Sequence, residues 1–374
     1  MTVNRLFSDF SDPQFQLAFP SDYTNASDWL DKAQELIGAK DIQRTAICIA
    51  RAMLCNPTEE DRATAHILLQ QNVPLLQALY ERLSADSRTL ETRDRLYVET
   101  PCKQLDTAVS DLKKYGIAVW PGMFKDWPRL EDAKTYGDAL YTEHIARFGS
   151  PGAAADTHKI QAPTSVKSTK GNYIFTGEPD NTQGRYRASF PVGGEKINNP
   201  HIDDPFFDDR IREVAGRYYG AKIQETYLLF ETLKPGTENQ KLHIDGMSDQ
   251  FKVLILLEDM SDENGPLVFE KGSHNTAPYM FDHFHAWFHK AADHPATNME
   301  TLEKAGIAEW VVTGEKGDCI FFDSHALHRG SPCIRGSRHN LVLTFSAYTL
   351  RSHVMQALDR GYLSEQALKR ASSN

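Results

Sequence analysis

Residues 243–257, HIDGMSDQFKVLILL, form the stretch on which the fold depends. Its second half, 251–257, is apolar on both faces, which indicates a strand buried on both sides of a β-sheet. Its first half begins with His243 and Asp245. On extended backbone these two side chains point to one face, because strand side chains alternate with a period of two. The sequence therefore predicts an imidazole and a carboxylate side by side at the mouth of a β-sheet core.

A second imidazole, His328, comes from far along the chain. Two imidazoles and one carboxylate on one side of an octahedral Fe(II) form a facial triad, which leaves three positions open for other ligands and oxygen. The His-x-Asp spacing is weak evidence by itself, because it also arises by chance or as a polar strand end without metal. Together with the motifs that follow His243 along the chain, the pattern favours a non-haem iron centre.

The chain contains a second His-x-Asp sequence at 201–203. It follows Pro200 and precedes residues 208–214, in which charged and apolar residues recur at helical spacing. An acidic opening marked by proline is typical of a helix N-terminus. We therefore interpret His201 as a helix cap or a surface residue rather than a metal ligand.

Downstream of His243, short motifs follow one another in series. They are Asn264-Gly265-Pro266-Leu267, Lys271-Gly272-Ser273-His274, Gly317-Asp318-Cys319-Ile320-Phe321-Phe322-Asp323, His325-Ala326-Leu327-His328-Arg329-Gly330-Ser331 and then Arg338. This order closely resembles the phytanoyl-CoA dioxygenase-like family of Fe(II)/2-oxoglutarate-dependent oxygenases. Residues 105–112 and 114–122 look like the opening helix and first strand of that family. The resemblance covers about residues 105–350, and its motifs are specific in combination.

The resemblance implies a mainly β catalytic core, a double-stranded β-helix of the jelly-roll, cupin-like kind, flanked by helices. It also implies that His243, Asp245 and His328 bind Fe(II), with 2-oxoglutarate and O2 as cosubstrates. Arg338 would form a two-point ion pair with the distal carboxylate of 2-oxoglutarate, because its planar guanidinium offers paired donors that lysine lacks. Thr232, near the end of the strand predicted at 227–233 before the metal pair, is a lesser candidate for a hydrogen bond to 2-oxoglutarate.

The case for Arg338 also rests on the alternation of residues 338–346. A period of two divides this strand into a polar face and an apolar face, which suits a barrel wall around a polar cavity. Arg329, next to a proposed metal ligand, and Arg335, before Gly336 in a predicted turn, are the alternatives for the same role. The polar face is Arg338, Asn340, Val342, Thr344 and Ser346, and the other is His339, Leu341, Leu343 and Phe345.

Asp245 bears on the type of reaction that the resemblance implies. Related halogenases have a small residue at this position, where chloride coordinates, so a carboxylate implies hydroxylation as the default outcome, with release of succinate and CO2. Desaturation and ring formation use the same ligands and stay open. We expect a small polar metabolite or natural-product intermediate as the substrate. The alternative is a protein side-chain hydroxylase that uses the N-terminal helices as a substrate adaptor.

Residues 1–100 are predicted to form a helical N-terminal segment, followed by the catalytic domain at 101–350 and a helical tail at 351–374. An N-cap signature at Ser27 begins the first helix. Residues 41–69 look somewhat like one tetratricopeptide repeat, but a lone repeat cannot bury its own face. We therefore favour a helical appendage packed on the barrel, or a dimer contact, over a peptide-binding adaptor. Helices are expected at 27–37, 42–54, 59–71 and 75–83.

The 374-residue chain carries a formal charge of -10 and has a pI near 5.8. Both values argue against nonspecific binding to nucleic acid or to anionic membranes. Its five cysteines form no CxxC pair and are typical of reduced intracellular thiols. No apolar signal region and no run of about 18 apolar residues occurs. We expect a cytoplasmic monomer or homodimer that acts on a small molecule, without nucleic-acid or membrane partners.

Two further regions combine side chains that suit a role near the site. Residues 151–199 mix basic and aromatic side chains, among them Arg185 and Arg187. They are expected over the mouth of the site, where they would either grip a polar or anionic substrate or form a solvated face. Residues 274–310 are rich in histidine and aromatic residues, and we expect a lid helix that packs its aromatic side chains on the barrel.

Overall fold

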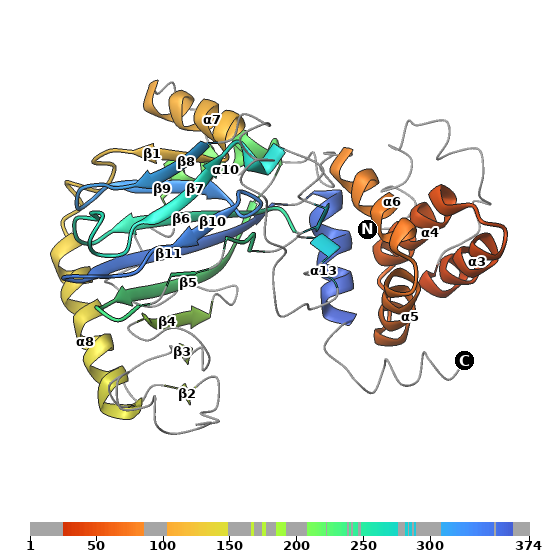
Figure 1. Cartoon of the computed structure of the whole chain (residues 1–374), viewed down its shortest axis with the longest axis horizontal. Coiled ribbons are helices and arrows are strands. Elements are labelled where there is room, and N and C mark those ends of the chain that lie inside the picture. The colour runs from red at the N-terminus through yellow and green to blue at the C-terminus, as the bar shows by residue number, and fades with distance from the viewer. Residues whose placement is uncertain are drawn as a thin grey trace.

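The computed structural model describes residues 25–85, 103–148, 166–167, 174–176, 185–191, 208–221, 223–237, 239–240, 242–245, 248–275, 281–282, 284–285, 288, 308–347 and 349–361. Within these residues the chain forms two antiparallel β-sheets, helices against them, and a group of helices beside them (Figure 1). The core is therefore mainly β with helices around it, as the sequence predicted.

The larger sheet has eight strands in the order β1-β9-β6-β11-β5-β4-β3-β2. Its central strands coincide, to within a few residues, with those predicted at 227–233, 251–257 and 338–346. The apolar runs and the alternation in the sequence therefore predicted the middle of the sheet correctly. The bounds are β1 (Ile117–Trp120), β9 (Cys319–Asp323), β6 (Gln250–Leu256), β11 (Arg338–Ala347), β5 (Ile223–Leu233), β4 (Arg185–Pro191), β3 (Ile174–Thr176) and β2 (Val166–Lys167).

The smaller sheet consists of β10 (His328–Gly330), β7 (Leu267–Lys271) and β8 (Ala308–Val312). Phe269 of this sheet belongs to one apolar cluster with Leu254, Phe322 and Val342 of the larger sheet. The two sheets therefore pack face to face, with this cluster between them. A short 3-10 helix, η2 (Ser273–Asn275), follows β7.

Strand β11 shows the alternation that the sequence predicted. Leu341, Leu343 and Phe345 belong to the apolar cluster on the outer side of the larger sheet. Val342 belongs to the cluster between the two sheets. All of β11 is buried, so its polar face, which begins at Arg338, lies inside the protein.

Three helices pack against the outer side of the larger sheet, where Leu112, Ala133 and Val214 share one apolar cluster with the strands. They are α7 (Lys103–Tyr115), α8 (Leu130–Phe148) and α10 (Asp209–Tyr219). The side chain of Asp208 caps α10 by accepting from the backbone N–H of Arg210. The helix predicted after the second His-x-Asp sequence is thus confirmed, while residues 201–203 themselves lie outside the described residues.

The four predicted N-terminal helices are α3 (Ala26–Gly38), α4 (Ile42–Leu54), α5 (Glu59–Gln70) and α6 (Val73–Ala85). The cap of α3 differs from the prediction, because the side chain of Asn25, two residues before Ser27, accepts from the backbone N–H of Asp28. Ser27 instead lies in the first turn and donates to Asn25 Oδ1. At α5, Thr58 and Asp61 form a reciprocal capping box.

Helices α3–α6 bury their apolar faces in a core that they share with distant parts of the chain. Helix α13 (Leu350–Gly361) packs against α4, α5 and α6 and lies between them and the sheets (Figure 1). Ile244 and Leu327, which flank the proposed metal ligands, belong to the same core. Residues from both sides of the boundary predicted near residue 100 therefore share this core.

Phe284 and Phe288, which we expected to pack on the barrel as part of a lid, belong to this helical core instead. Phe288 stacks on His66 of α5 with ring centroids 4.3 Å apart, and Phe284 stacks on Tyr80 of α6 at 4.9 Å. The aromatic spacing correctly indicated a buried face. The prediction that these side chains pack on the barrel was wrong, because periodicity shows which side chains are buried and not what covers them.

Four of the five cysteines, Cys48, Cys55, Cys319 and Cys333, are described, and all four are buried free thiols. Burial raises the pKa of Cys48 to about 12, although Arg51 opposes that shift, so this thiol stays protonated at neutral pH. Among the described residues, no helix combines the length and the apolar character needed to span a membrane.

Candidate metal centre

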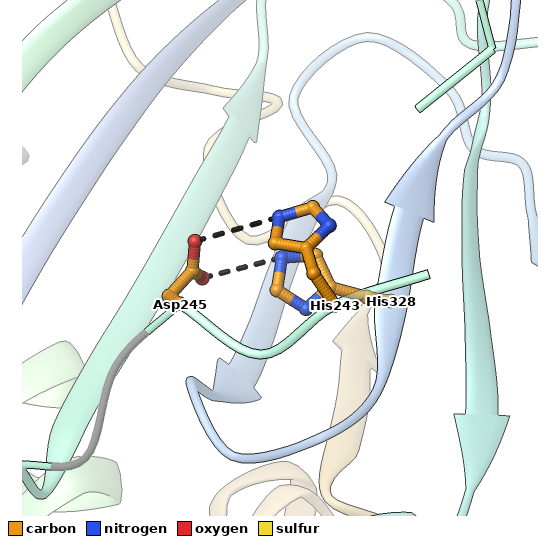
Figure 2. Close-up of side chains that lie close together, drawn as sticks. All are labelled: His243, Asp245 and His328. Carbon is orange, nitrogen blue, oxygen red and sulfur yellow. Dashed lines mark ion pairs between the residues drawn. The ribbon is translucent and has the colours of Figure 1, made fainter. Parts of the chain in front are cut away.

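The structure brings His243, Asp245 and His328 together, with one ligand atom from each lying within 4.8 Å of the others. His328 Nε2 lies 3.2 Å from Asp245 Oδ2, and His243 Nε2 lies 3.9 Å from Asp245 Oδ1. Both imidazoles direct a nitrogen towards the carboxylate (Figure 2). Within the described residues, this is the group of His, Cys, Asp and Glu side chains with the geometry to hold a metal ion.

Backbone hydrogen bonds between distant segments fix this arrangement. His243 and His328 form an isolated antiparallel bridge, in which each backbone N–H donates to the other residue's carbonyl at 2.9 Å. The backbone N–H of Asp245 donates to the carbonyl of Ser324 at 3.0 Å. The segment that carries the His-x-Asp pair is therefore held against the segment that carries the second imidazole.

His328 has a defined tautomer. Its Nδ1 lies 2.8 Å from the carbonyl oxygen of Ala326, and because a carbonyl oxygen only accepts, Nδ1 carries the proton in this bond. In the neutral imidazole Nε2 then has the free lone pair, and this is the nitrogen next to Asp245. The rings of Phe269 and Phe322 contact the imidazole with centroids 5.4 and 5.2 Å away and restrict its rotation.

The Asp245 carboxylate is held in its charged form. Burial alone would raise its pKa, but the Lys252 ammonium, followed by the His328 imidazole, holds that pKa well below its usual range. Its Oδ2 is buried and, apart from its ion pair with Lys252, has no hydrogen bond of normal geometry to a described residue. A buried carboxylate oxygen beside a free imidazole lone pair fits a divalent cation, which would satisfy both groups at once.

Lys252 is a residue of the site that we did not predict. Its Nζ lies 2.8 Å from Asp245 Oδ2. In β6 it stands opposite Thr344 of β11 and Phe322 of β9, on the face that carries Leu254 into the cluster between the sheets. The available signal was a single lysine within the run 251–257, because a charged residue in a strand buried on both faces requires a partner.

Arg338 opens β11, and its side chain is 0% exposed. Its Nη2 donates to Glu231 Oε1 at 2.8 Å, and its Nη1 donates to the carbonyl of Gly265. Once the Asn340 amide is oriented to satisfy both of its polar groups, its oxygen accepts from Arg338 Nε at 2.9 Å. The guanidinium is therefore fixed on three sides by the protein.

Glu231 links Arg338 to the arginines of β4. Arg187 Nε donates to Glu231 Oε2 at 2.9 Å, and Arg185 Nε lies 3.9 Å from the same oxygen. Burial opposes ionisation of this carboxyl, but Arg187, Arg185 and Arg338 together lower the pKa of Glu231 far below its usual value. Arg185 also reaches β10, because a Cβ placed on Gly330 would lie 2.7 Å from Arg185 Nη2.

The other sequence candidates lie elsewhere. Arg335 has a side chain that is 75% exposed and pairs with Glu263. Arg329 pairs with Glu309 and donates to Asn239. Neither takes the buried position that Arg338 holds.

Thr232 does not share a face with Arg338. The register pairs Thr232 with His339, and Thr232 Oγ1 lies 2.8 Å from His339 Nδ1. In a strand, neighbouring side chains point to opposite faces, so Glu231 rather than Thr232 lies on the face of Arg338. This geometry does not support the 2-oxoglutarate contact that we expected from Thr232.

The fold and the three converging side chains are those of a β protein with a candidate metal site. The model of the phytanoyl-CoA dioxygenase (PhyH) family matches residues 160–338, a range that includes His243, Asp245, His328 and Arg338. These residues are therefore similar to the PhyH family, and the resemblance inferred from the motifs is confirmed. No curated protein sequence matches the chain significantly.

Solved structures with some similarity to the chain include AviO1 from Streptomyces viridochromogenes Tue57, at 15% identity and a TM-score of 0.43, covering 66% of this chain and 96% of AviO1. Another is EctD from S. alaskensis with bound Fe, at 18% identity and a TM-score of 0.43, covering 71% and 86%. A third is HygX from Streptomyces hygroscopicus with nickel, 2-oxoglutarate and hygromycin B bound, at 13% identity and a TM-score of 0.40, covering 64% and 86%.

Proposed function

We propose that this protein is an Fe(II)/2-oxoglutarate-dependent dioxygenase that hydroxylates a small polar metabolite or natural-product intermediate. The observation that carries the proposal is the convergence of two imidazoles and one carboxylate within 4.8 Å, with Nε2 of His328 left as a lone-pair donor. The match to the PhyH family supports the same class. The two facing antiparallel sheets would correspond to the double-stranded β-helix of that family.

In this proposal, His243 Nε2, His328 Nε2 and an oxygen of Asp245 would hold Fe(II), with room left for 2-oxoglutarate and oxygen. With 2-oxoglutarate bound, the centre supplies the oxidising chemistry, in which one oxygen atom of O2 enters the substrate and the other enters succinate as CO2 leaves. Arg338 would bind the distal carboxylate of 2-oxoglutarate. Glu231, Asn340 and the Gly265 carbonyl fix the direction in which its guanidinium points.

The side chains around the site favour a dry, ordered centre. Phe269 and Phe322 pack on the His328 ring and limit access of water from that side. Lys252 pairs with Asp245 and lowers the pKa of its carboxyl in the metal-free protein. We propose hydroxylation over chlorination because Asp245 supplies a carboxylate where a halogenase needs room for chloride. No observation on the described residues favours the alternative of a protein side-chain hydroxylase.

The test is a spectroscopic titration under anaerobic conditions. Addition of Fe(II) and 2-oxoglutarate to the metal-free protein should give a weak violet charge-transfer band, because 2-oxoglutarate would chelate the iron. The variants His243→Ala and Asp245→Ala should lose the band, while His201→Ala should keep it. A band that survives in both site variants, or that depends on His201, would place the metal elsewhere and overturn the proposal.

The substrate class has a separate test. Fe(II)-loaded protein is supplied with 2-oxoglutarate and O2, and succinate release is compared with and without each candidate metabolite. A true substrate should stimulate succinate release and appear as a product that has gained one oxygen atom. Stimulation by a polypeptide and by no small molecule would favour the alternative function.

A further inference from the structure

Ile244 and Leu327 each stand directly beside a proposed metal ligand and are almost fully buried, at 2% and 0% exposure. Both belong to the core formed by helices α3–α6 and α13. Ile244 separates His243 from Asp245, and Leu327 precedes His328. The same two short segments thus carry metal ligands on one side and core residues of the helical group on the other.

This arrangement follows from the geometry of extended backbone. When His243 and Asp245 point to one face, the residue between them points to the opposite face. That face is covered by the helices, whose core also contains Leu79 of α6 and Met53 of α4. A shift of Ile244 or Leu327 within this core would therefore move the backbone that carries the ligands.

A polar link fastens the metal-binding segment to the same helices. The Asp249 carboxylate, four residues after Asp245, accepts from Arg351 of α13 and from Thr349 just before it. The Asp249 carbonyl accepts from the backbone N–H of Ala347 at 2.9 Å. Helix α13 in turn packs against α4, α5 and α6. The His-x-Asp segment is thus held to the helices by an apolar contact and by a partly buried ion pair.

The segment that carries His328 is also held in place by contacts with other parts of the chain. The backbone N–H of Leu327 donates to Ser273 Oγ at 2.8 Å, and that hydroxyl belongs to η2. Further along the chain, Phe284 and Phe288 stack on α6 and α5. The region that supports His328 is therefore connected to the helices at several points.

We propose that helices α3–α6, together with α13, form a positioning scaffold for the metal centre, and that Ile244 and Leu327 are the positioning residues through which the scaffold acts. These helices lie outside residues 160–338, the range of the family match. The inference rests on the proposed function only in assigning the metal to His243, Asp245 and His328.

The first test compares two matched cavity variants. Leu79→Ala empties a site in the scaffold core, and Leu112→Ala empties one beneath the outer face of the large sheet; both leucines are 0% exposed. The affinity of the metal-free protein for Co(II) is measured by calorimetry, and the visible spectrum of bound Co(II) is recorded. We expect about a tenfold or greater loss of affinity and a changed spectrum for Leu79→Ala, as found when groups that orient ligands are altered. The Co(II) affinity of Leu112→Ala should stay within about twofold of that of wild type, with an unchanged spectrum.

A second, milder variant keeps the test decisive if Leu79→Ala does not fold. Ile244→Val removes one methyl group and should weaken Co(II) binding by about threefold, with Ile244→Leu restoring most of the loss. Because coupling between two sites is reciprocal, Co(II) should also slow amide hydrogen exchange in α4 and α6 more than in α7.

The outcomes separate this inference from the proposed function. If wild-type protein does not bind Co(II), or binds it without His243, the proposed metal site is wrong and the scaffold role falls with it. If wild type binds Co(II) through His243 but the Leu79→Ala and Ile244→Val proteins bind it as tightly, the metal site stands and the scaffold role is refuted. Equal losses in Leu79→Ala and Leu112→Ala would likewise refute it, because they would reflect global stability alone.

Discussion

Lys252 Nζ lies 2.8 Å from Asp245 Oδ2, so an ammonium group stands beside a carboxylate that we propose as a ligand of a divalent cation. The lysine stabilises the charged carboxylate in the metal-free protein, but it also repels an incoming cation. At neutral pH the carboxyl is ionised with or without the lysine, so the repulsion should dominate the effect on metal affinity.

We therefore expect Lys252→Met to bind Co(II) about tenfold or more tightly than wild type at pH 7.5, because one positive charge within a few ångströms of the metal is removed. Without Lys252 the pKa of Asp245 should rise, so metal binding should also begin to fail at a higher pH as the solution is acidified. Calorimetric titrations at several pH values measure both effects. Lys252→Arg keeps the charge and should resemble wild type. Weaker Co(II) binding by Lys252→Met would mean that the lysine orients Asp245 rather than opposing the metal.

Arg338→Ala should raise the concentration of 2-oxoglutarate needed for half-maximal succinate release by about tenfold or more, because a buried charge-assisted pair is lost. Arg335→Ala should change it by less than about twofold, since Arg335 is exposed and surface pairs contribute little. Arg338→Lys should recover only part of the loss, because an ammonium lacks the paired donors of guanidinium. Equal effects of the two alanine variants would show that Arg338 is the wrong arginine.

Glu231 should make the free energy of unfolding of the protein depend on pH in the acidic range. The pKa of this carboxyl is lowered in the folded state, so the stability it contributes is fully present above the unfolded value of about 4.3 and is lost as the pH falls further. Glu231→Gln should be less stable at pH 7 by about 3 kcal/mol or more, since buried arginines lose their partner. Below pH about 4, the difference in free energy of unfolding between the variant and wild type should become smaller. It should shrink by at most about 1.4 kcal/mol per pH unit, because one proton is involved.

Urea unfolding between pH 7 and pH 3 measures this effect. Glu263→Gln is the matched control, because Glu263 pairs with Arg335 at the surface and should cost less than about 1 kcal/mol at any pH. If the difference in free energy of unfolding between wild type and Glu231→Gln stays constant down to pH 3, the lowered pKa of Glu231 is contradicted.

Two glycines in left-handed conformation should differ in their tolerance of a side chain. Gly317 (φ +87°) and Gly336 (φ +81°) both sit in turns, but a Cβ on Gly317 would lie 2.8 Å from the backbone of Lys125, whereas a Cβ on Gly336 would meet nothing within 4 Å. Gly336→Ala should cost about 1 kcal/mol from backbone strain alone. Gly317→Ala should cost roughly 1–3 kcal/mol more, because the Lys125 backbone must move. Urea unfolding gives both values, and similar losses would show that the Gly317 turn adjusts without cost.

Much of the core could be predicted from local sequence. The apolar run of β6 and the alternation of β11 are properties of a few consecutive residues, and backbone geometry converts them directly into buried strands. The same geometry placed His243 and Asp245 on one face, and the helix at Ile42–Leu54 was predicted with its observed bounds. The motif order then indicated a family, which the match to residues 160–338 confirmed.

The sequence by itself thus determined which side chains were available to hold a metal and which segments would be strands. Only the tertiary structure decided that Lys252 meets Asp245, that Glu231 rather than Thr232 shares a face with Arg338, and that Ile244 and Leu327 enter the core of the N-terminal helices. Each of these contacts joins residues from segments far apart in the chain. Their positions depend on strand register and on which surfaces pack together, and neither is fixed by the periodicity of a single segment.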